Sequence, residues 1–159
     1  MFYPLTPLRF LHRAVDLYGH KTGVICGEKT FTFAQFGERC ERLAAVLRRL
    51  DINPGDRVAF LSFNTHKLLE GYLGVIQARG IGMPLNVRLT PEELTAIVEH
   101  SGARYLFFEK DFTPIAEHIR MNCGGLEYVV GLDELERPAD YLYEDLLSAE
   151  KPERADPVV

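Results

Sequence analysis

Five histidines and three cysteines are the side chains best suited to metal or nucleophilic chemistry in this sequence. The histidines show no H-E-x-x-H or zinc-like spacing, and Cys26, Cys40 and Cys123 are too far apart to form a ligand set. The sequence also lacks the G-x-x-x-x-G-K-[ST] phosphate loop and the G-x-S-x-G nucleophile elbow. It therefore predicts no catalytic residue and no metal site within these 159 residues.

One arginine lies in a stretch with clear local chemistry, "PLNVRLTPEEL" at residues 84–94. Thr90, Pro91 and Glu93 are explained as the N-cap, the first-turn proline and the capping-box acid of a helix. The capping pattern does not account for the arginine at position 88. A guanidinium is always charged and its planar fork suits a phosphate, whereas the alternative is a solvated loop charge. Both interpretations of Arg88 are open at this point.

Several helix start signals lie along the chain, each an N-cap residue placed before a periodic apolar run. Thr32 and Gln35 form a second capping box. The helix after Asn64 or Thr65 is apolar around most of its circumference, so we expect it to be well buried. Helices are expected to begin after Thr6, after Thr32, after Asn64 or Thr65, after Thr90 and at Thr113, with a short one over 140–148.

The segments between these helices have the composition of strands. "RVAFLSF" at residues 57–63 is apolar on both faces, which is typical of a central parallel strand. Further strands are expected at 83–85, 103–109 and 126–132, and an earlier hairpin at 24–26 and 29–31. The alternation predicts the α/β class: a mostly parallel sheet with helices on both faces, flavodoxin-like or Rossmann-like, preceded by a small hairpin.

Composition excludes several function classes. The net charge of −5 and the acidic pI near 5.5 argue against a nucleic-acid-binding protein. No run approaches the ~20 apolar residues needed to span a membrane, and the N-terminus lacks a secretory pattern. The three widely spaced cysteines each lie in or beside an apolar stretch, so they are expected to be buried, reduced thiols. We therefore expect a cytoplasmic protein without a transmembrane segment.

A series of short motifs carries a family resemblance. Each motif is weak alone, but their order and spacing are specific over residues 6–130. The motifs are Thr32 to Gln35, Gly55 to Val58, Asn64, Gly80-x-Gly82, Pro84-Leu85-Asn86, Arg88-Leu89, Glu93-Leu94 and Ser101-x-Ala103. In this order they resemble the N-terminal part of the adenylate-forming acyl-CoA synthetases, also called AMP-binding enzymes. The PLNxRL form is most similar to the acyl- or aryl-CoA ligase branch.

The resemblance implies a reaction for the parent enzyme. Such enzymes use Mg-ATP to convert a carboxylic acid, here expected to be a fatty acid, to an acyl-adenylate, and then transfer the acyl group to coenzyme A. The family's phosphate loop, magnesium ligand and catalytic lysine would follow residue 159. We therefore expect residues 1–150 to be the N-terminal subdomain and 151–159 a linker-like tail toward a missing remainder. No cofactor is expected in the fragment itself.

The resemblance also implies which residues of this sequence are candidates for binding CoA. In CoA-ligase relatives the arginine of PLNxRL lies where the nucleotide end of CoA docks, and Arg88 matches that position. Asn86 belongs to the same loop, and Lys110 follows a strand whose exit approaches CoA in some relatives. Asn86, Arg88 and Lys110 are thus the candidate CoA-binding residues. The alternatives are a solvated loop charge for Arg88, a surface lysine for Lys110, and a helix cap for Asn64.

We expect the chain to be the N-terminal fragment of an AMP-forming acyl-CoA synthetase, inactive alone. One alternative is a non-catalytic binding or dimerisation module, which would complement a separately encoded C-terminal half. Another is a flavodoxin-like ligand-binding domain of unrelated function. A fragment that lacks the rest of its enzyme would expose apolar surface or a strand edge, so a homodimer or other self-association is expected.

Overall fold

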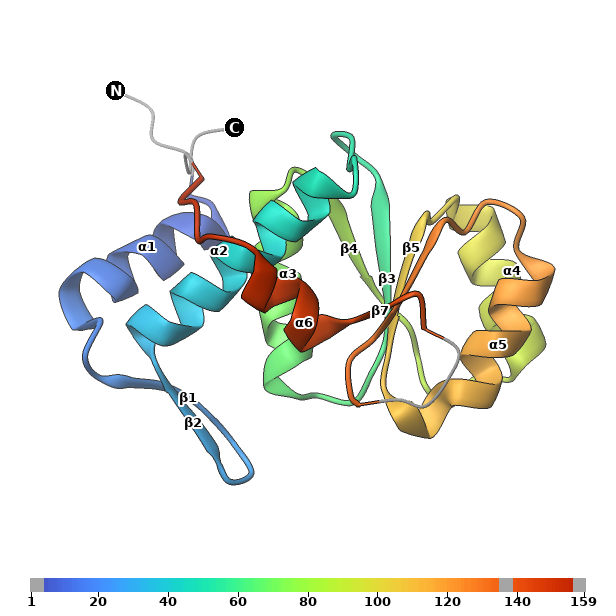
Figure 1. Ribbon diagram of the computed structural model, residues 1–159, viewed down its shortest axis with the longest axis horizontal. Coiled ribbons are helices and arrows are strands. Elements are labelled where there is room, and N and C mark those ends of the chain that lie inside the picture. The colour runs from blue at the N-terminus through green and yellow to red at the C-terminus, as the bar shows by residue number, and fades with distance from the viewer. Residues whose placement is uncertain (1–4, 135–138, 156–159) are drawn as a thin grey trace.

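The computed structural model describes residues 5–134 and 139–155, which form three layers with a parallel sheet in the middle (Figure 1). The strand order is β4-β3-β5-β6-β7, and every neighbouring pair is parallel. The strands are β3 (Arg57–Leu61), β4 (Ile81–Pro84), β5 (Tyr105–Phe108), β6 (Tyr128–Gly131) and β7 (Tyr141–Leu142). The predicted fold class is confirmed.

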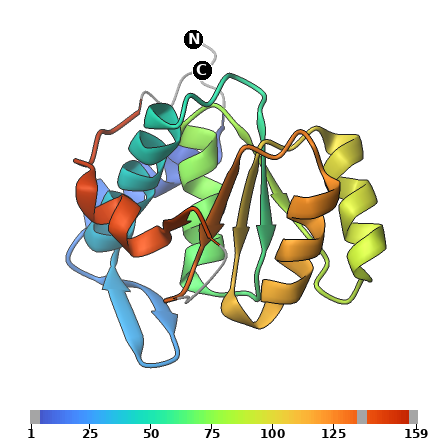
Figure 2. The same ribbon diagram turned by 45° about the vertical axis from the view of Figure 1, so that its right-hand side comes forward.

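Helices cover both faces of the sheet (Figure 2). Helices α2, α3 and α6 lie on one face, α4 and α5 lie on the other, and α1 packs on α2 and α3. The helices are α1 (Pro7–Tyr18), α2 (Phe33–Arg49), α3 (His66–Gln77), α4 (Pro91–Ser101), α5 (Thr113–Asn122) and α6 (Tyr143–Ala149), with a 3₁₀ turn η1 (Lys110–Phe112). None of the helices in the described ranges is long and apolar enough to cross a membrane.

A two-stranded hairpin precedes the sheet, as predicted. It pairs β1 (Thr22–Cys26) with β2 (Lys29–Thr32) in antiparallel register. Gly27 at its tip has a φ of 57°, a left-handed conformation that glycine adopts without strain. The hairpin projects away from the sheet beside α3 (Figure 1).

The core consists of two apolar clusters, one on each face of the sheet. Successive residues of a strand point to opposite faces, so β3 sends Val58 and Phe60 into one cluster and Ala59 and Leu61 into the other. All four are at most 1% exposed. This explains why the strand is apolar at every position and confirms that it is central.

Both predicted capping boxes are present. The Thr32 hydroxyl accepts from Gln35 N at 3.2 Å, and the Gln35 side chain accepts from Thr32 N at 2.9 Å. The same reciprocal pair joins Thr90 and Glu93, at 3.3 and 2.8 Å. Each box satisfies two backbone N–H groups that a helix start leaves without partners, which fixes where α2 and α4 begin.

Helix α3 approaches its neighbours closely because two glycines face them. A Cβ atom at Gly71 would lie 2.5 Å from Phe60 Cζ of β3, and one at Gly74 would lie 2.8 Å from Leu43 Cδ2 of α2. Real Cβ atoms do not make such contacts. Larger side chains at these two positions would therefore push α3 away from the sheet and from α2.

The expectation that α3 is well buried is wrong for part of its surface. Leu69, Tyr72 and Ile76 are each 39–40% exposed, while the charged residues Lys67 and Glu70 are 7% and 0% exposed. The helix therefore has a second apolar stripe that nothing in the described residues covers. The charged side chains of Lys67 and Glu70 can be buried because each has hydrogen-bond partners on neighbouring elements, as described below.

Ion pairs hold the segment after α6 against the first two helices. Arg154 forms a bidentate pair with Asp16 of α1 at 2.7 and 2.8 Å. Two further pairs join this segment to α2: Arg48–Glu153 at 3.2 Å and Arg49–Glu150 at 2.9 Å. Residues 151–155 of the predicted linker-like tail thus lie on the domain, and the domain boundary at residue 150 stays a prediction.

Candidate functional site

The sheet has a point at which the direction of its connections reverses. From β3 the chain passes through α3 to β4 on one side, and then through α4 to β5 on the other side. In open α/β sheets, ligands bind beside the carboxyl ends of the strands at such a reversal. The edge formed by the ends of β4, β3 and β5 is therefore the candidate site.

A buried carboxylate organises this edge. Glu109 directly follows β5 and is only 7% exposed. It accepts hydrogen bonds from Ser62 Oγ at 2.8 Å, from Thr65 Oγ1 at 3.2 Å and from Phe63 N at 3.3 Å. All three donors lie in the loop after β3, so Glu109 fixes that loop to the end of β5. Thr65 occupies the N-cap position of α3, but its side chain makes no capping hydrogen bond to the helix.

A buried lysine, Lys67, links α3 to the segment that follows β6. Lys67 of α3 is 7% exposed, and its ammonium donates to the Leu132 carbonyl and lies 3.3 Å from the Asp133 carboxylate. The other Asp133 oxygen accepts from Lys110 N at 3.1 Å. The exits of β5 and β6 are thus tied to each other and to α3.

The three candidate residues from sequence lie along this same edge. Asn86 and Arg88 follow β4, Lys110 follows β5, and all three are exposed. Because β3 lies between those strands, the two cationic residues are separated by roughly two strand spacings, or about 10 Å, along the sheet. The structure therefore brings them to one edge without placing them in contact.

The Asn86 side chain shapes its own loop. Its Oδ1 accepts from Arg88 N at 3.1 Å, the local turn that asparagine favours. The Arg88 guanidinium and the Lys110 ammonium have no hydrogen-bond or ion-pair partner among the described residues. Both cationic groups are consequently free to meet an anion from outside.

Sequence reasoning missed the residues that build this edge. Glu109 stood at the end of a strand pattern, and a carboxylate directly after a buried apolar run is the signal that could have identified it. Ser62 and Asp133 gave no signal, because their partners are 47 and 66 positions away. Lys67 gave no signal either, because lysines on helices are usually exposed.

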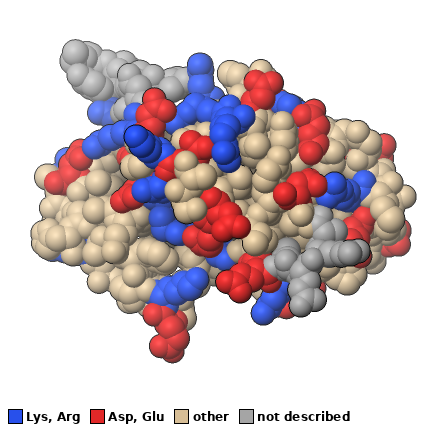
Figure 3. Space-filling view, viewed as in Figure 1, with Lys and Arg blue, Asp and Glu red and all other residues tan. Residues whose placement is uncertain are grey.

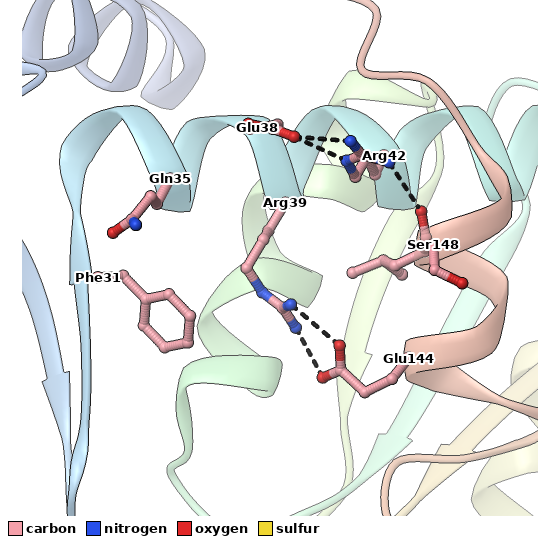
Figure 4. Close-up of a pocket in the computed structure, with 8 residues that line it drawn as sticks. Phe31, Gln35, Glu38, Arg39, Arg42, Glu144 and Ser148 are labelled. Carbon is pink, nitrogen blue, oxygen red and sulfur yellow. Dashed lines mark hydrogen bonds and ion pairs between the residues drawn. The ribbon is translucent and has the colours of Figure 1, made fainter.

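A second charged cluster lies between α2, α3 and α6, beside a pocket of about 480 Å³ (Figure 4). Arg39 forms one bidentate pair with Glu70, at 2.6 and 3.1 Å, and another with Glu144, at 3.0 and 2.8 Å. The hydroxyl of buried Tyr143 donates to Glu70 at 2.7 Å. These contacts join three helices through one arginine.

The electrostatics of this cluster follow from burial and pairing. Burial raises the pKa of Glu70, although hydrogen bonds from Arg39 and Tyr143 act in the opposite direction. Burial would also raise the pKa of Glu144, but the Arg39 hydrogen bond and charge hold it below its usual value. The Arg39 guanidinium is thus already neutralised by two carboxylates. We assign the cluster a structural role in clamping α6 to α2 and α3.

Charges elsewhere show no single-sign concentration on the face that carries α2 and α6. Figure 3 shows basic and acidic side chains interspersed over it. No group of three or more His, Cys, Asp or Glu side chains gathers as a metal site within residues 5–134 and 139–155. Cys40 and Cys123 are buried, whereas Cys26 is partly exposed, contrary to the expectation of a buried thiol in its apolar stretch.

Several curated relatives of this sequence are described as CoA ligases, and others as probable acyl-activating enzymes. The long-chain-fatty-acid–CoA ligase of Thermus thermophilus is 37% identical over 94% of this chain and 28% of its own length. The peroxisomal benzoate–CoA ligase of Arabidopsis thaliana is 38% identical over 71% of this chain and 20% of its own length. The chain therefore spans less than a third of these relatives.

Solved structures share the fold. The anthranilate CoA ligase AuaEII in complex with anthranoyl-AMP superimposes with a TM-score of 0.88 at 22% identity, covering 98% of this chain and 31% of its own. The N-terminal domain of FACL13 from Mycobacterium tuberculosis gives 0.83 at 21% identity, covering 94% and 37%. A family model described as AMP-binding enzyme matches residues 11–158. Since that match extends over nearly all of the sequence, the chain belongs to the AMP-binding enzyme family.

Proposed function

We propose that this chain is the N-terminal part of an AMP-forming acid–CoA ligase and supplies a docking surface for the nucleotide end of coenzyme A. In the complete enzyme a carboxylic acid would react with Mg-ATP to give an acyl-adenylate, and the acyl group would then pass to CoA. The observation that carries the proposal is the free, exposed Arg88 guanidinium at the carboxyl edge of the sheet.

Arg88 has the right chemistry for this role. A guanidinium can donate two parallel hydrogen bonds to a phosphate, which a lysine cannot. Asn86 holds the loop through the Arg88 backbone, so the side chain starts from a defined position. Lys110 contributes a second cation across β3, and its backbone is fixed by Asp133. The role of these residues in CoA binding is supported by chemistry and by family position.

The first experiment measures CoA binding to the purified chain by calorimetry. Arg88→Ala is expected to weaken binding about tenfold, because a charged hydrogen bond to phosphate contributes on the order of 1.5 kcal/mol. Arg57→Ala is the matched control, since Arg57 is also exposed but lies at the amino end of β3, on the opposite edge. Equal effects of the two substitutions would contradict the assignment of Arg88.

We further propose that the chain alone does not catalyse adenylation. The reaction needs the acid, Mg-ATP and a cationic clamp held together, because adenylyl transfer is catalysed by positioning and charge stabilisation. The prediction is no acid-dependent pyrophosphate release above background, with acids from butyrate to palmitate and with benzoate. Turnover with any of these acids would overturn it.

The acid is proposed to be a fatty acid, and the relatives support only the wider class of acids. Some are described as ligases of long-chain fatty acids, and others of benzoate or butyrate. A cytoplasmic location also stays a prediction, because several relatives are described as peroxisomal.

A second candidate function is a non-catalytic binding or dimerisation module. The exposed apolar stripe of Leu69, Tyr72 and Ile76 on α3 favours it, since such a stripe needs a packing partner. This module would complement a separately encoded C-terminal half. Restored adenylation on mixing with that half would support complementation, and failure to bind it would exclude this alternative.

A further inference from the structure

An aromatic side chain lies open at the candidate edge of the sheet. Phe63 follows β3 and is 48% exposed. Its ring packs on that of Phe112, which is only 8% exposed, with centroids 4.9 Å apart and an interplanar angle of 51°. Such tilted pairs are a favourable aromatic geometry. The inner ring therefore supports the outer one, and nearly half of the Phe63 side chain remains open to solvent.

The backbone of Phe63 is held at both of its polar groups. Its N–H donates to the Glu109 carboxylate at 3.3 Å. Its carbonyl accepts from Ser62 Oγ and from Thr65 N, each at 2.8 Å. A side chain that starts from a fixed backbone and already packs on a buried ring loses little conformational freedom when a ligand contacts it. Phe63 is thus a preorganised apolar platform.

A cationic residue lies on each side of the loop that carries this platform. Because β3 lies between β4 and β5, Phe63 is flanked by Arg88, which follows β4, and by Lys110, which follows β5. Neighbouring strands are about 5 Å apart. Both cationic groups are exposed and have no hydrogen-bond or ion-pair partner among the described residues. Lys110 and Phe112 belong to the same 3₁₀ turn, so this cation and the supporting ring are positioned together.

The carboxylates near the platform are already held by donors. Glu109 is 7% exposed and accepts three hydrogen bonds. Asp133 accepts from Lys110 N at 3.1 Å and lies 3.3 Å from the Lys67 ammonium. A neutral planar group over Phe63 meets no charge repulsion from Glu109. Anionic groups of the same ligand would instead be attracted outward, to the two free cations.

We propose that the adenine ring of coenzyme A stacks on Phe63, while Arg88 and Lys110 bind phosphates on opposite sides of its ribose. The proposal rests on the CoA-docking function proposed above and adds the residue that holds the base. Two cations on either side of one ring match an adenosine that carries phosphate on both its 3′ and its 5′ oxygen. CoA has this arrangement, whereas the phosphates of ATP are all on the 5′ side.

A fluorescence titration tests the stacking directly. The sequence contains no tryptophan, so Phe63→Trp introduces a single reporter at the platform. Adenosine 3′,5′-bisphosphate should quench its emission saturably, because a stacked base contacts the face of the indole. 4′-Phosphopantetheine, which lacks the adenine, should not quench it. AMP should bind at least tenfold more weakly than the bisphosphate, since it leaves one cation without a phosphate. Equal affinity for AMP would overturn the proposal.

Substitutions at the same position separate stacking from simple packing. In calorimetry with CoA, Phe63→Ala should weaken binding about tenfold, because stacking of one base on an aromatic ring contributes roughly that factor. Phe63→Leu should weaken it as much, since leucine keeps an apolar contact with Phe112 but has no aromatic face. Phe63→Tyr should remain within twofold of the unsubstituted chain. If Phe63→Leu binds CoA as well as Phe63→Tyr does, the stacking proposal is wrong.

Phe10→Ala is the matched control for Phe63→Ala. Phe10 is 62% exposed but lies on α1, which packs on α2 and α3, and its loss should change CoA binding less than twofold. Both phenylalanines are exposed, so both variants should fold, which circular dichroism can verify. Equal effects of these two substitutions would also overturn the platform.

The same titrations distinguish this proposal from the docking function on which it rests. Weaker CoA binding with Arg88→Ala but not with Phe63→Ala would overturn the stacking and leave the docking role of Arg88 in place. Weaker binding with Phe63→Ala, together with equal effects of Arg88→Ala and Arg57→Ala, would support the platform and contradict the role of Arg88. Failure of both CoA and adenosine 3′,5′-bisphosphate to bind would overturn both proposals.

Discussion

Glu70 of α3 joins its helix to two others through a buried carboxylate. Its carboxylate has no exposed surface and is held by Arg39 and Tyr143, which come from α2 and α6. A buried charge contributes little net stability while it is paired, but removing its partner leaves it uncompensated.

That asymmetry leads to a prediction. Arg39→Leu should lower the free energy of unfolding by about 3–5 kcal/mol, and Tyr143→Phe by about 1–2 kcal/mol, in urea denaturation at pH 7. Replacing both members of the pair, as Arg39→Met with Glu70→Met, should recover most of the loss from Arg39→Leu.

Glu38 provides the control for this prediction. It pairs with Arg42 at 2.7 Å but is 49% exposed, so Glu38→Gln should change the free energy of unfolding by less than about 0.5 kcal/mol. An Arg39→Leu cost no larger than that of Glu38→Gln would show that the cluster has no structural role.

At this scale the sequence is a poor guide to buried charges. Arg88 was identified because its loop has a recognisable pattern and its side chain has no local explanation. Glu70, Lys67 and Glu109 were missed because their burial depends on partners that lie 31 to 73 positions away along the chain. Hydrophobic periodicity assigns such residues to solvent.

At the scale of elements, the helix starts are encoded locally and can be tested locally. Thr32→Ala and Thr90→Ala should each lower the free energy of unfolding by about 1 kcal/mol, because each removes the acceptor of a capping box. Thr30→Ala is the control, since Thr30 is exposed in β2 and should cost less than about 0.5 kcal/mol. Equal costs for all three would contradict the capping interpretation.

All strands except β7 were predicted in place and type, whereas the order of the strands in the sheet was not. A strand such as β3 can be recognised from its run of apolar residues, but its two neighbours in the sheet are determined by tertiary packing. The last strand, β7, was missed because it has only two residues, and the predicted helix at 140–148 begins instead at Tyr143. A segment that short has no periodicity to detect.

At the scale of the whole molecule, self-association stays a prediction, and the structure indicates which surface would drive it. Both edge strands of the parallel sheet are poorly suited to pair with a strand of another copy. β4 has four residues and ends in Pro84, and β7 has only two residues. The apolar stripe of α3 and the exposed Phe10 and Ile25 offer a larger apolar surface.

Sedimentation velocity at increasing concentration is expected to show a dimer or higher oligomer of the chain. Tyr72→Asp on the α3 stripe should shift the distribution toward monomer. Met121→Asp should not, because Met121 is 78% exposed on α5, on the other side of the sheet. A strictly monomeric profile at high concentration would contradict the prediction.

The strand order has a consequence for how the domain folds while it is being synthesised. The first strand of the parallel sheet to be synthesised, β3, lies between β4 and β5, and β5, β6 and β7 join on one side of it in the order in which they are translated. Only β4 adds to the opposite side, and it does so before β5 exists. The sheet can therefore grow outward from β3 during translation, and no late strand has to insert between two earlier ones.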